Sequence, residues 1–235
     1  MDGDGSAARS TGLTPGELAA AAVPGAARVV GVSADAVVSV DATEHARRIA
    51  AGLGPVLDVS VLQALMHLPL HAEVSTEDLG EVNLRLLGKA PTGCVDWLDG
   101  GSRVRRRYTP AAAVSLVVVR GATWRPALRR AATFEPFAAR TVLLTRPPRR
   151  VTDIAWEADV DGTGLWIVCP GRDHCGEIDE AVTPAPYVSR YLKPAKWQFA
   201  EHAYAAWLAQ TTQTAAPTET VPRGRPVGQG VSARP

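Results

Sequence analysis

Three arginines at alternate positions, Arg103, Arg105 and Arg107, have the most regular spacing for chemistry in this sequence. In an extended strand every second side chain points to the same side, so their guanidinium groups share one face. Guanidinium groups bind phosphate oxygens through paired, charge-assisted hydrogen bonds. The spacing therefore predicts a phosphate-binding face. The alternative is a solvated hairpin edge whose charges prevent association with other sheets.

Cys169, His174 and Cys175 bring together sulfur and imidazole groups, the ligands that zinc prefers. Structural zinc sites usually contain pairs of cysteines separated by two to four residues. This segment has instead a five-residue spacing followed by an adjacent histidine and cysteine. We therefore expect an ordinary loop. A metal site and an enzyme that uses these residues are the alternatives, and no other cofactor is predicted.

The segment from Asp159 to Thr163 reads Asp-Val-Asp-Gly-Thr and matches the signature of the haloacid dehalogenase-like hydrolases. In that family the first aspartate attacks phosphate and the second acts as acid and base. The signature should follow an apolar strand near the start of a domain, whereas here it follows Trp-Glu-Ala with 72 residues left. A capped turn is the better interpretation.

Composition sets limits on the function. The chain has 235 residues, 46% of them hydrophobic and 21% charged, as in an average soluble globular protein. Its 25 basic and 24 acidic residues give a net charge of +1, so nucleic-acid binding would require a local patch. Three cysteines make no disulfide framework, and neither a signal peptide nor a membrane-spanning apolar run is recognised. These features predict a cytoplasmic protein that does not enter a membrane.

We expect an α/β protein with a mixed sheet and flanking helices. Disordered tails are predicted at residues 1–16 and 211–235, where the sequence is rich in small and polar residues. An N-terminal region at 17–90 would combine a β-hairpin with helices. An α/β core would occupy 91–210 and end in a docked helix.

Local patterns place the individual elements. The β-rich runs at 28–32 and 36–40 predict a hairpin joined at Ser33-Ala34-Asp35. Capping residues and apolar spacing predict helices at 41–51 and 58–68 and between 75 and 88. The further predictions are strands at 94–99, 111–120, 140–145 and 165–168 and helices from 123, at 151–160 and at 194–210.

The order of these elements from Cys94 to Val168 resembles the core of the PD-(D/E)XK nuclease-like superfamily. In that superfamily a hairpin carries acidic residues, and a strand is followed by a helix and a further strand. The resemblance implies a restriction-endonuclease-like core, with the first acidic metal ligand at Asp96 and the (D/E)-x-K pair at Val118 and Arg120. Valine offers no oxygen to Mg²⁺, and the guanidinium group cannot accept a proton. The resemblance therefore implies a degenerate member that is not a nuclease.

The resulting hypothesis is a non-catalytic nucleic-acid-binding or regulatory protein. A different hypothesis is a protein-interaction module that docks a partner through the aromatic helix at 194–210 and binds no nucleic acid. In the first hypothesis the nucleic acid would contact Arg103, Arg105, Arg107, Arg120 and Arg129, with the hairpin arginines beside Arg120.

Overall fold

A computed structural model of the chain describes residues 13–170, 175–188 and 193–215. The strands are β1 (Val23–Val29), β2 (Val32–Val40), β3 (Glu73–Ser75), β4 (Val95–Leu98), β5 (Arg103–Arg106), β6 (Ala112–Gly121), β7 (Ala139–Leu144), β8 (Gly164–Pro170) and β9 (Cys175–Val182). The α-helices are α1 (Pro15–Ala21), α2 (Ala42–Ala50), α3 (Val59–Met66), α4 (Glu81–Leu87), α5 (Trp124–Ala132), α6 (Val151–Asp161) and α7 (Pro194–Ala215), with 3-10 turns η1 (Thr76–Asp78) and η2 (Asp99–Gly101).

The protein is α/β, as predicted, and its main element is a mixed sheet of six strands. The strand order is β1-β2-β6-β7-β8-β9, in which β6, β7 and β8 are parallel to one another. Helices α5 and α6 connect the parallel strands, while β2 and β9 pair with antiparallel neighbours. The parallel strands therefore all end at one edge of the sheet, called here the carboxyl edge. The helix predicted at 151–160 is confirmed as α6.

The first hairpin turns earlier than the sequence predicted. Val29 pairs with Val32, so the turn consists of Val30 and Gly31, both with positive φ (44° and 77°). Such a two-residue turn matches the natural twist of a hairpin. The predicted joint at Ser33-Ala34-Asp35 is wrong, because these residues belong to β2. The carboxylate of Asp35 therefore belongs to the sheet and not to a loop.

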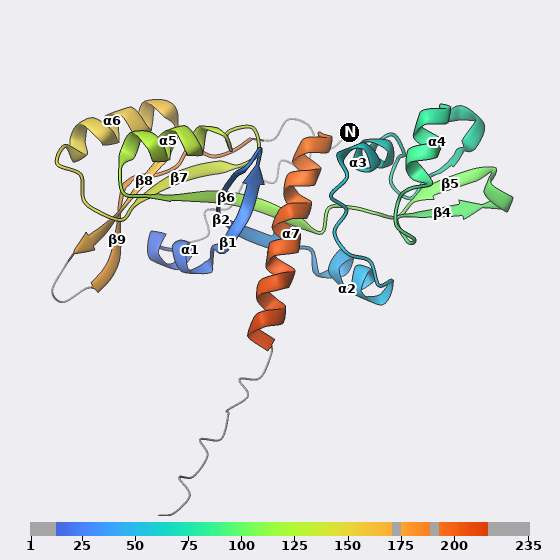
Figure 1. The fold of residues 1–235 in the computed structure, drawn as a ribbon, viewed down its shortest axis with the longest axis horizontal. Helices are drawn as coiled ribbons and strands as arrows, with labels where there is room; N and C mark the ends of the chain where they lie inside the picture. The colour runs from blue at the N-terminus through green and yellow to red at the C-terminus, as the bar shows by residue number, and fades with distance from the viewer. Residues whose placement is uncertain (1–12, 171–174, 189–192, 216–235) are drawn as a thin grey trace, which may run out of the picture.

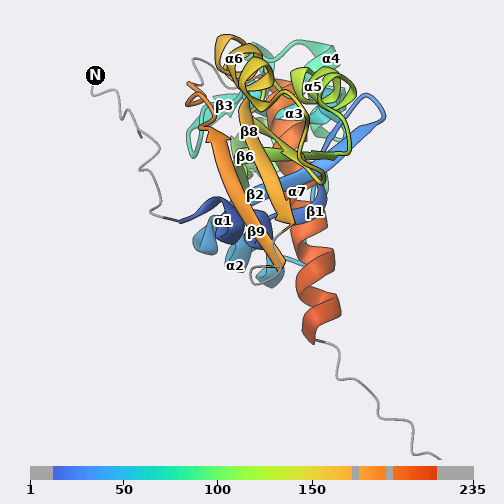
Figure 2. The same cartoon turned by 90° about the vertical axis from the view of Figure 1, so that its left-hand side faces the viewer.

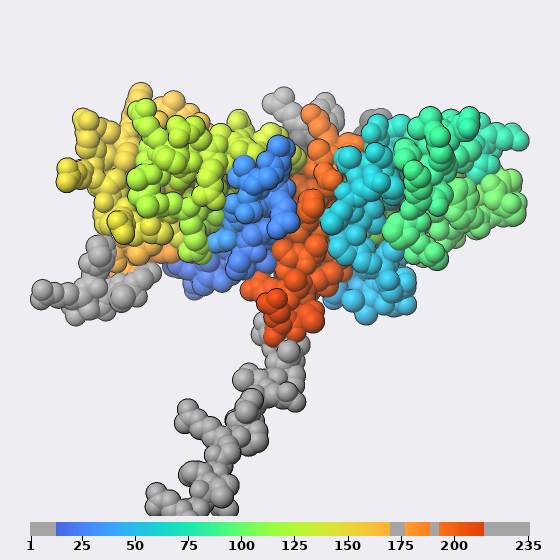
Figure 3. Space-filling model, in the orientation of Figure 1, coloured from blue at the N-terminus to red at the C-terminus, as the bar shows by residue number. Residues whose placement is uncertain are grey.

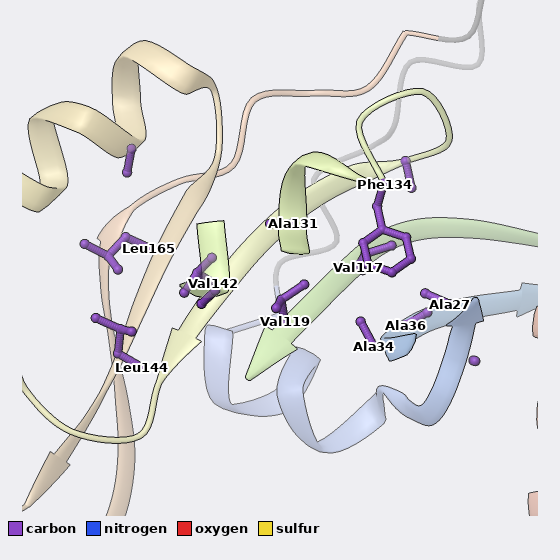
Figure 4. Close-up of a cluster of buried hydrophobic side chains, with 14 of the residues drawn as sticks. Ala27, Ala34, Ala36, Val117, Val119, Ala131, Phe134, Val142, Leu144 and Leu165 are labelled. Carbon is purple, nitrogen blue, oxygen red and sulfur yellow. The ribbon is translucent and has the colours of Figure 1, made fainter. Parts of the chain in front are cut away.

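The faces of the six-stranded sheet are covered differently. Helices α5, α6 and α7 pack on one face, where Phe134, Ala158 and Phe199 join the largest core cluster. Figure 4 shows Phe134 of this cluster beside Val117. Helix α1 packs on the opposite face against Leu116 and Trp166 (Figure 2). The sheet face that meets α7 carries small side chains, including those of Ala27, Ala34 and Ala36, so the helix can approach the hairpin closely.

A smaller lobe is inserted between β2 and β6. It contains α2, α3, α4 and a three-stranded sheet of order β3-β5-β4, with a separate core that includes Leu62, Leu65 and Trp197. The strand predicted at 94–99 is β4, which belongs to this small sheet and not to the six-stranded one. In place of the single helix predicted between 75 and 88, the chain forms the end of β3, then η1 and α4.

Helix α7 lies between the two lobes (Figures 1 and 3). Its Glu201 is fully buried and receives two hydrogen bonds from Arg48 of α2, each 2.8 Å long. Tyr108 and Trp197 donate to the same carboxylate at 2.7 and 3.1 Å. Burial lowers the pKa of Arg48, but Glu201 outweighs burial and raises that pKa above its ordinary value. The buried pair joins the lobes through charges that are fully hydrogen-bonded.

The predicted tails are shorter than expected where the structure describes them. Helix α1 begins at Pro15 with a capping box between Thr14 and Glu17, although residues 1–16 were assigned to a tail. Helix α7 continues to Ala215, five residues beyond its predicted end at 210. Residues 1–12 and 216–235 lie outside the described residues. No described helix has the length and apolar composition needed to cross a membrane.

Candidate functional site

Arg103 and Arg105 of β5 and the following Arg107 share one face of the small sheet, where each is close to a carboxylate, whereas Arg106 of β5 lies over the ring of Trp197. Arg103 pairs with Glu73 of β3 at 2.6 Å and also with Asp99. Arg105 pairs with Asp96 of β4 at 2.9 Å, and Arg107 is 3.8 Å from the same carboxylate. Three carboxylates thus offset the three positive charges, and the positive potential predicted for this face is largely cancelled.

Arg120 and Arg129 belong to the other lobe. Arg120 lies near the end of β6, a strand of ten residues, whereas Arg103 and Arg105 lie in β5, before the start of β6. The small sheet and helices α5 and α6 occupy opposite ends of the molecule (Figure 1). The expectation that the hairpin arginines lie beside Arg120 is therefore corrected, because the structure does not bring the five predicted arginines into one surface.

The carboxylate that does meet Arg120 comes from β2. Asp35 lies directly opposite Val118 in the antiparallel pair of β2 and β6. The Nε atom of Arg120 donates a hydrogen bond of 2.6 Å to Oδ2 of Asp35. The backbone N–H of Gly25 donates to Oδ1 of the same carboxylate at 3.2 Å, and Nη2 of Arg120 donates to the carbonyl oxygen of Ala19 at 3.5 Å. The carboxylate of Asp35 and the guanidinium group of Arg120 are thus each oriented by two hydrogen bonds.

Arg130 reaches the same place from the last turn of α5. Its Nη1 donates to the carbonyl oxygen of Arg120 at 3.3 Å, and its Nη2 donates to the carbonyl oxygen of Ser33 at 3.1 Å. Asp35, Arg120 and Arg130 line a cavity of about 250 Å³ whose other walls include Gly25 and Val118. The cavity thus holds two guanidinium groups and one carboxylate.

More arginines lie along the carboxyl edge. The N–H of Thr145 donates to the carbonyl oxygen of Gly121 at 3.0 Å, so the loops that follow β6 and β7 lie side by side. These loops and the start of α5 carry Arg125, Arg146 and Arg149, which are exposed and ion-pair with no carboxylate in the described ranges. A neighbouring arginine, Arg150, pairs with Asp153 at 2.7 Å. The edge carries an excess of positive charge.

The residues around Arg120 do not fit the divalent cation that the nuclease resemblance implies. Asp96, the predicted acidic ligand, lies in the small sheet, and Asp35 is the acidic residue on the strand that pairs with β6. Val118 is fully buried and has no donor oxygen, while the Asp35 carboxylate already accepts from Arg120 and Gly25. Magnesium requires several oxygen ligands. Among the described residues no three histidine, cysteine, aspartate or glutamate side chains are grouped for a metal.

Of the three candidate zinc ligands, Cys169 has a described side chain. Cys169 is half-buried near the end of β8, with its Sγ 4.0 Å from the carbonyl oxygen of Ile167. His174 and the side chain of Cys175 lie outside the described part of the chain. In the small lobe, burial raises the pKa of Cys94 to about 12, so that thiol stays protonated at neutral pH.

Two other predicted features have a structural role. Trp197, Phe199 and Tyr204 of the predicted docked helix, which the protein-interaction hypothesis assigned to a partner, are buried inside this chain along α7. The Asp-Val-Asp-Gly-Thr segment is the end of α6, where Gly162 adopts φ 68° and its N–H donates to the carbonyl oxygens of Ala158 and Asp159. The prediction of a capped turn there is confirmed.

Sequence reasoning missed Asp35 and Arg130. The misplaced turn assigned Asp35 to a loop, although the alternation of Ala34, Ala36 and Val38 continues through it and indicates a strand. Gly31 was the available turn signal. Arg130 could not be told from Arg129, because only the packing of α5 decides which of them reaches the strand ends. No protein-family model, curated protein or solved structure matches this chain.

Proposed function

We propose that this chain is a non-catalytic nucleic-acid-binding or regulatory protein built on a degenerate nuclease-like scaffold. The observation that carries the proposal is the Asp35–Arg120 ion pair across β2 and β6. In the nuclease-like pattern, an acidic residue from a hairpin faces a strand that carries (D/E)-x-K. Here that strand carries Val118 and Arg120, and its antiparallel neighbour supplies Asp35.

The same residues argue against hydrolysis by that mechanism. Cleavage of a phosphodiester with a metal needs carboxylates to hold the ion that generates the nucleophile. The position of the second carboxylate is occupied by Val118, and the position of the lysine by Arg120, whose guanidinium group cannot act as a base. Arg120 keeps guanidinium donors that can bind phosphate oxygens, so binding can persist where catalysis cannot.

The carboxyl edge favours a polyanion as the ligand. Open α/β sheets usually bind ligands beyond the carboxyl ends of their parallel strands. At that edge Arg125, Arg146 and Arg149 add positive charge that no described carboxylate offsets. A row of guanidinium groups beside two strand ends suits the repeating phosphates of a nucleic acid. Arg103 and Arg105 are less suited, because the carboxylates on the same face of the small sheet offset the charge that would attract a phosphate.

Fluorescence anisotropy with labelled duplex DNA, single-stranded DNA and RNA tests this proposal, with and without Mg²⁺ and over a salt series. We expect binding that weakens with salt and leaves the nucleic acid intact. The double variant Arg146→Gln/Arg149→Gln should bind about tenfold more weakly and reduce the salt slope by about two.

The matched control is Arg103→Gln/Arg105→Gln, which removes the same number of charges from the other lobe and should change the affinity by less than about twofold. The reverse result would assign binding to the small sheet. Cleavage that depends on Mg²⁺ would show that the protein is an enzyme. Failure to bind any of the three nucleic acids would favour the protein-interaction hypothesis.

A further inference from the structure

We propose that the cavity between Asp35, Arg120 and Arg130 is a metal-independent phosphate clamp, in which Arg130 supplies the free positive charge and Asp35 holds Arg120 in position. This inference rests on the proposed function and names the residues that would contact a backbone phosphate. The clamp uses Arg130 in place of Arg129, the residue of helix α5 that was predicted from the sequence to contact nucleic acid.

The charge balance inside the cavity favours an anionic ligand. Arg120 is paired with Asp35 at 2.6 Å, so these two side chains together contribute little net charge. Arg130 donates only to two carbonyl oxygens, which leaves its full positive charge without a described carboxylate partner. A single phosphate group would therefore meet one uncompensated guanidinium and one compensated guanidinium.

Hydrogen bonds to the backbone hold the guanidinium group of Arg130 in place at the cavity. The carbonyl oxygens of Ser33 and Arg120 lie where the hydrogen-bonded ladder between β2 and β6 ends, and both accept from Arg130. This anchors a long side chain whose ordering would otherwise cost rotamer entropy when a ligand binds. The cavity of about 250 Å³ is large enough for a phosphate group next to the exposed half of Arg120, whose side chain is 50% exposed.

The Asp35–Arg120 pair can share Arg120 with a further anion. The side chain of Arg120 is 50% exposed, although that of Asp35 is only 18% exposed, so water reaches the guanidinium group and screens its side of the pair. A phosphate oxygen can thus share Arg120 with Asp35 at low cost. The carboxylate keeps Arg120 oriented, and it also repels the phosphate. Its removal should accordingly tighten the binding of a polyanion, the opposite of what removal of a metal ligand would do.

The test compares Arg130→Gln, Arg129→Gln and Asp35→Asn by anisotropy with a short labelled DNA duplex in buffer containing EDTA. Glutamine at 130 removes the charge and keeps a polar side chain. We expect Arg130→Gln to weaken binding about tenfold and Arg129→Gln by less than about twofold. Asp35→Asn should tighten binding severalfold and steepen the salt slope by about one.

The outcomes separate the clamp from the proposed function. Equal effects of the 129 and 130 variants, with a wild-type protein that binds DNA, would overturn the clamp and leave nucleic-acid binding standing. Weaker binding by Asp35→Asn would also overturn it. A wild-type protein that binds no duplex would overturn both. The thermal unfolding midpoint of each variant serves as the control for folding, and if Arg130→Gln does not fold, the Asp35→Asn result decides alone.

Discussion

Arg48 and Arg120 are both ion-paired, but burial gives the two pairs different consequences. The side chain of Arg48 is fully buried and bound to Glu201 and Glu44. Loss of either carboxylate therefore leaves the charge of Arg48 less well compensated at a place that water does not reach. The side chain of Arg120 is half-exposed, and its pair with Asp35 is worth at most about 1 kcal/mol. We therefore expect Arg48 to stabilise the fold and Arg120 to be accessible to a ligand.

Glu44 should make stability depend on pH. Burial raises the pKa of Glu44, but hydrogen bonds and charges from Arg47 and Arg48 outweigh burial and lower it below its ordinary value. A carboxylate with a lowered pKa in the folded state stabilises the protein at neutral pH, and this contribution is lost as the pH falls below about 4.5.

Urea unfolding of wild type and Glu44→Gln measures this effect. We expect the variant to be less stable by about 2 kcal/mol at neutral pH, with a difference that shrinks as the pH is lowered. A difference that stays constant from neutral pH down to about pH 3.5 would show that Glu44 does not titrate as described.

At the scale of elements, the β1–β2 hairpin and helix α5 determine the geometry of the candidate site. The tight turn at Val30 and Gly31 sets the register of β1 against β2, and the separate pairing of β2 with β6 puts Asp35 opposite Val118. Helix α5 begins next to the carboxyl edge and returns over the sheet, and the side chain of Arg130 reaches the start of β2 and the end of β6. A shift of one residue in the pairing of β2 with β6 would move Asp35 to the other face of the sheet.

The turn itself offers a stabilising substitution. Val30 is 94% exposed and has φ 44°, a left-handed conformation that a β-branched residue adopts at a cost. Asparagine tolerates this conformation and is favoured with a following glycine in such turns. Val30→Asn should raise the free energy of unfolding by about 0.5–1 kcal/mol, measured by thermal and urea unfolding. The control Val82→Asn changes an exposed valine inside α4 and should not stabilise. No gain at position 30 would argue against the strained turn.

At the scale of the whole molecule, the two lobes are joined by α7 and the Arg48–Glu201 pair. Trp197 packs in the core of the small lobe, and Phe199 packs in the core of the larger one. One helix thus completes two hydrophobic cores, and a buried ion pair lies between them. We expect the lobes to unfold together, since neither core is complete without α7.

Glu201→Gln tests this coupling. The substitution weakens the bonds from Arg48 and Tyr108 to the carboxylate and should cost about 3 kcal/mol, measured by urea unfolding. Wild type should show one transition by tryptophan fluorescence and by circular dichroism, and the variant should separate the two signals. Arg150→Gln, which breaks an ion pair on the surface, is the control and should have no measurable effect. Two transitions in wild type would contradict the coupling.

Metal independence of the proposed binding is a prediction at the scale of the whole molecule. If the guanidinium groups at the carboxyl edge bind phosphate directly, the affinity for duplex DNA should not be higher in Mg²⁺ than in EDTA at matched ionic strength, because Mg²⁺ competes for the phosphates. Anisotropy titrations in the two buffers measure this. A large gain of affinity in Mg²⁺ would indicate a cation site that uses other carboxylates than those described here.

Elements with local signals were predictable from the sequence. Asp41 and Asp58 cap α2 and α3 as expected, and their side chains accept from the first N–H groups of each helix. The apolar run of β6 and the capping glycine of α6 were also recognised. Strand β9 was not, because its sequence, with Glu177, Asp179 and Glu180, shows little of the apolar pattern of a strand.

By itself the sequence determined the α/β class, most helices of the chain and the lack of a D-x-K pair at Val118 and Arg120. Those features depend on neighbours a few residues apart, so periodicity and capping reveal them. Only the tertiary structure decided that Asp96 neutralises Arg105 in the small sheet while Asp35 meets Arg120 in the large one. The reason is that strand pairing joins residues far apart in sequence, and the charge of a surface depends on which carboxylates that pairing brings beside its arginines.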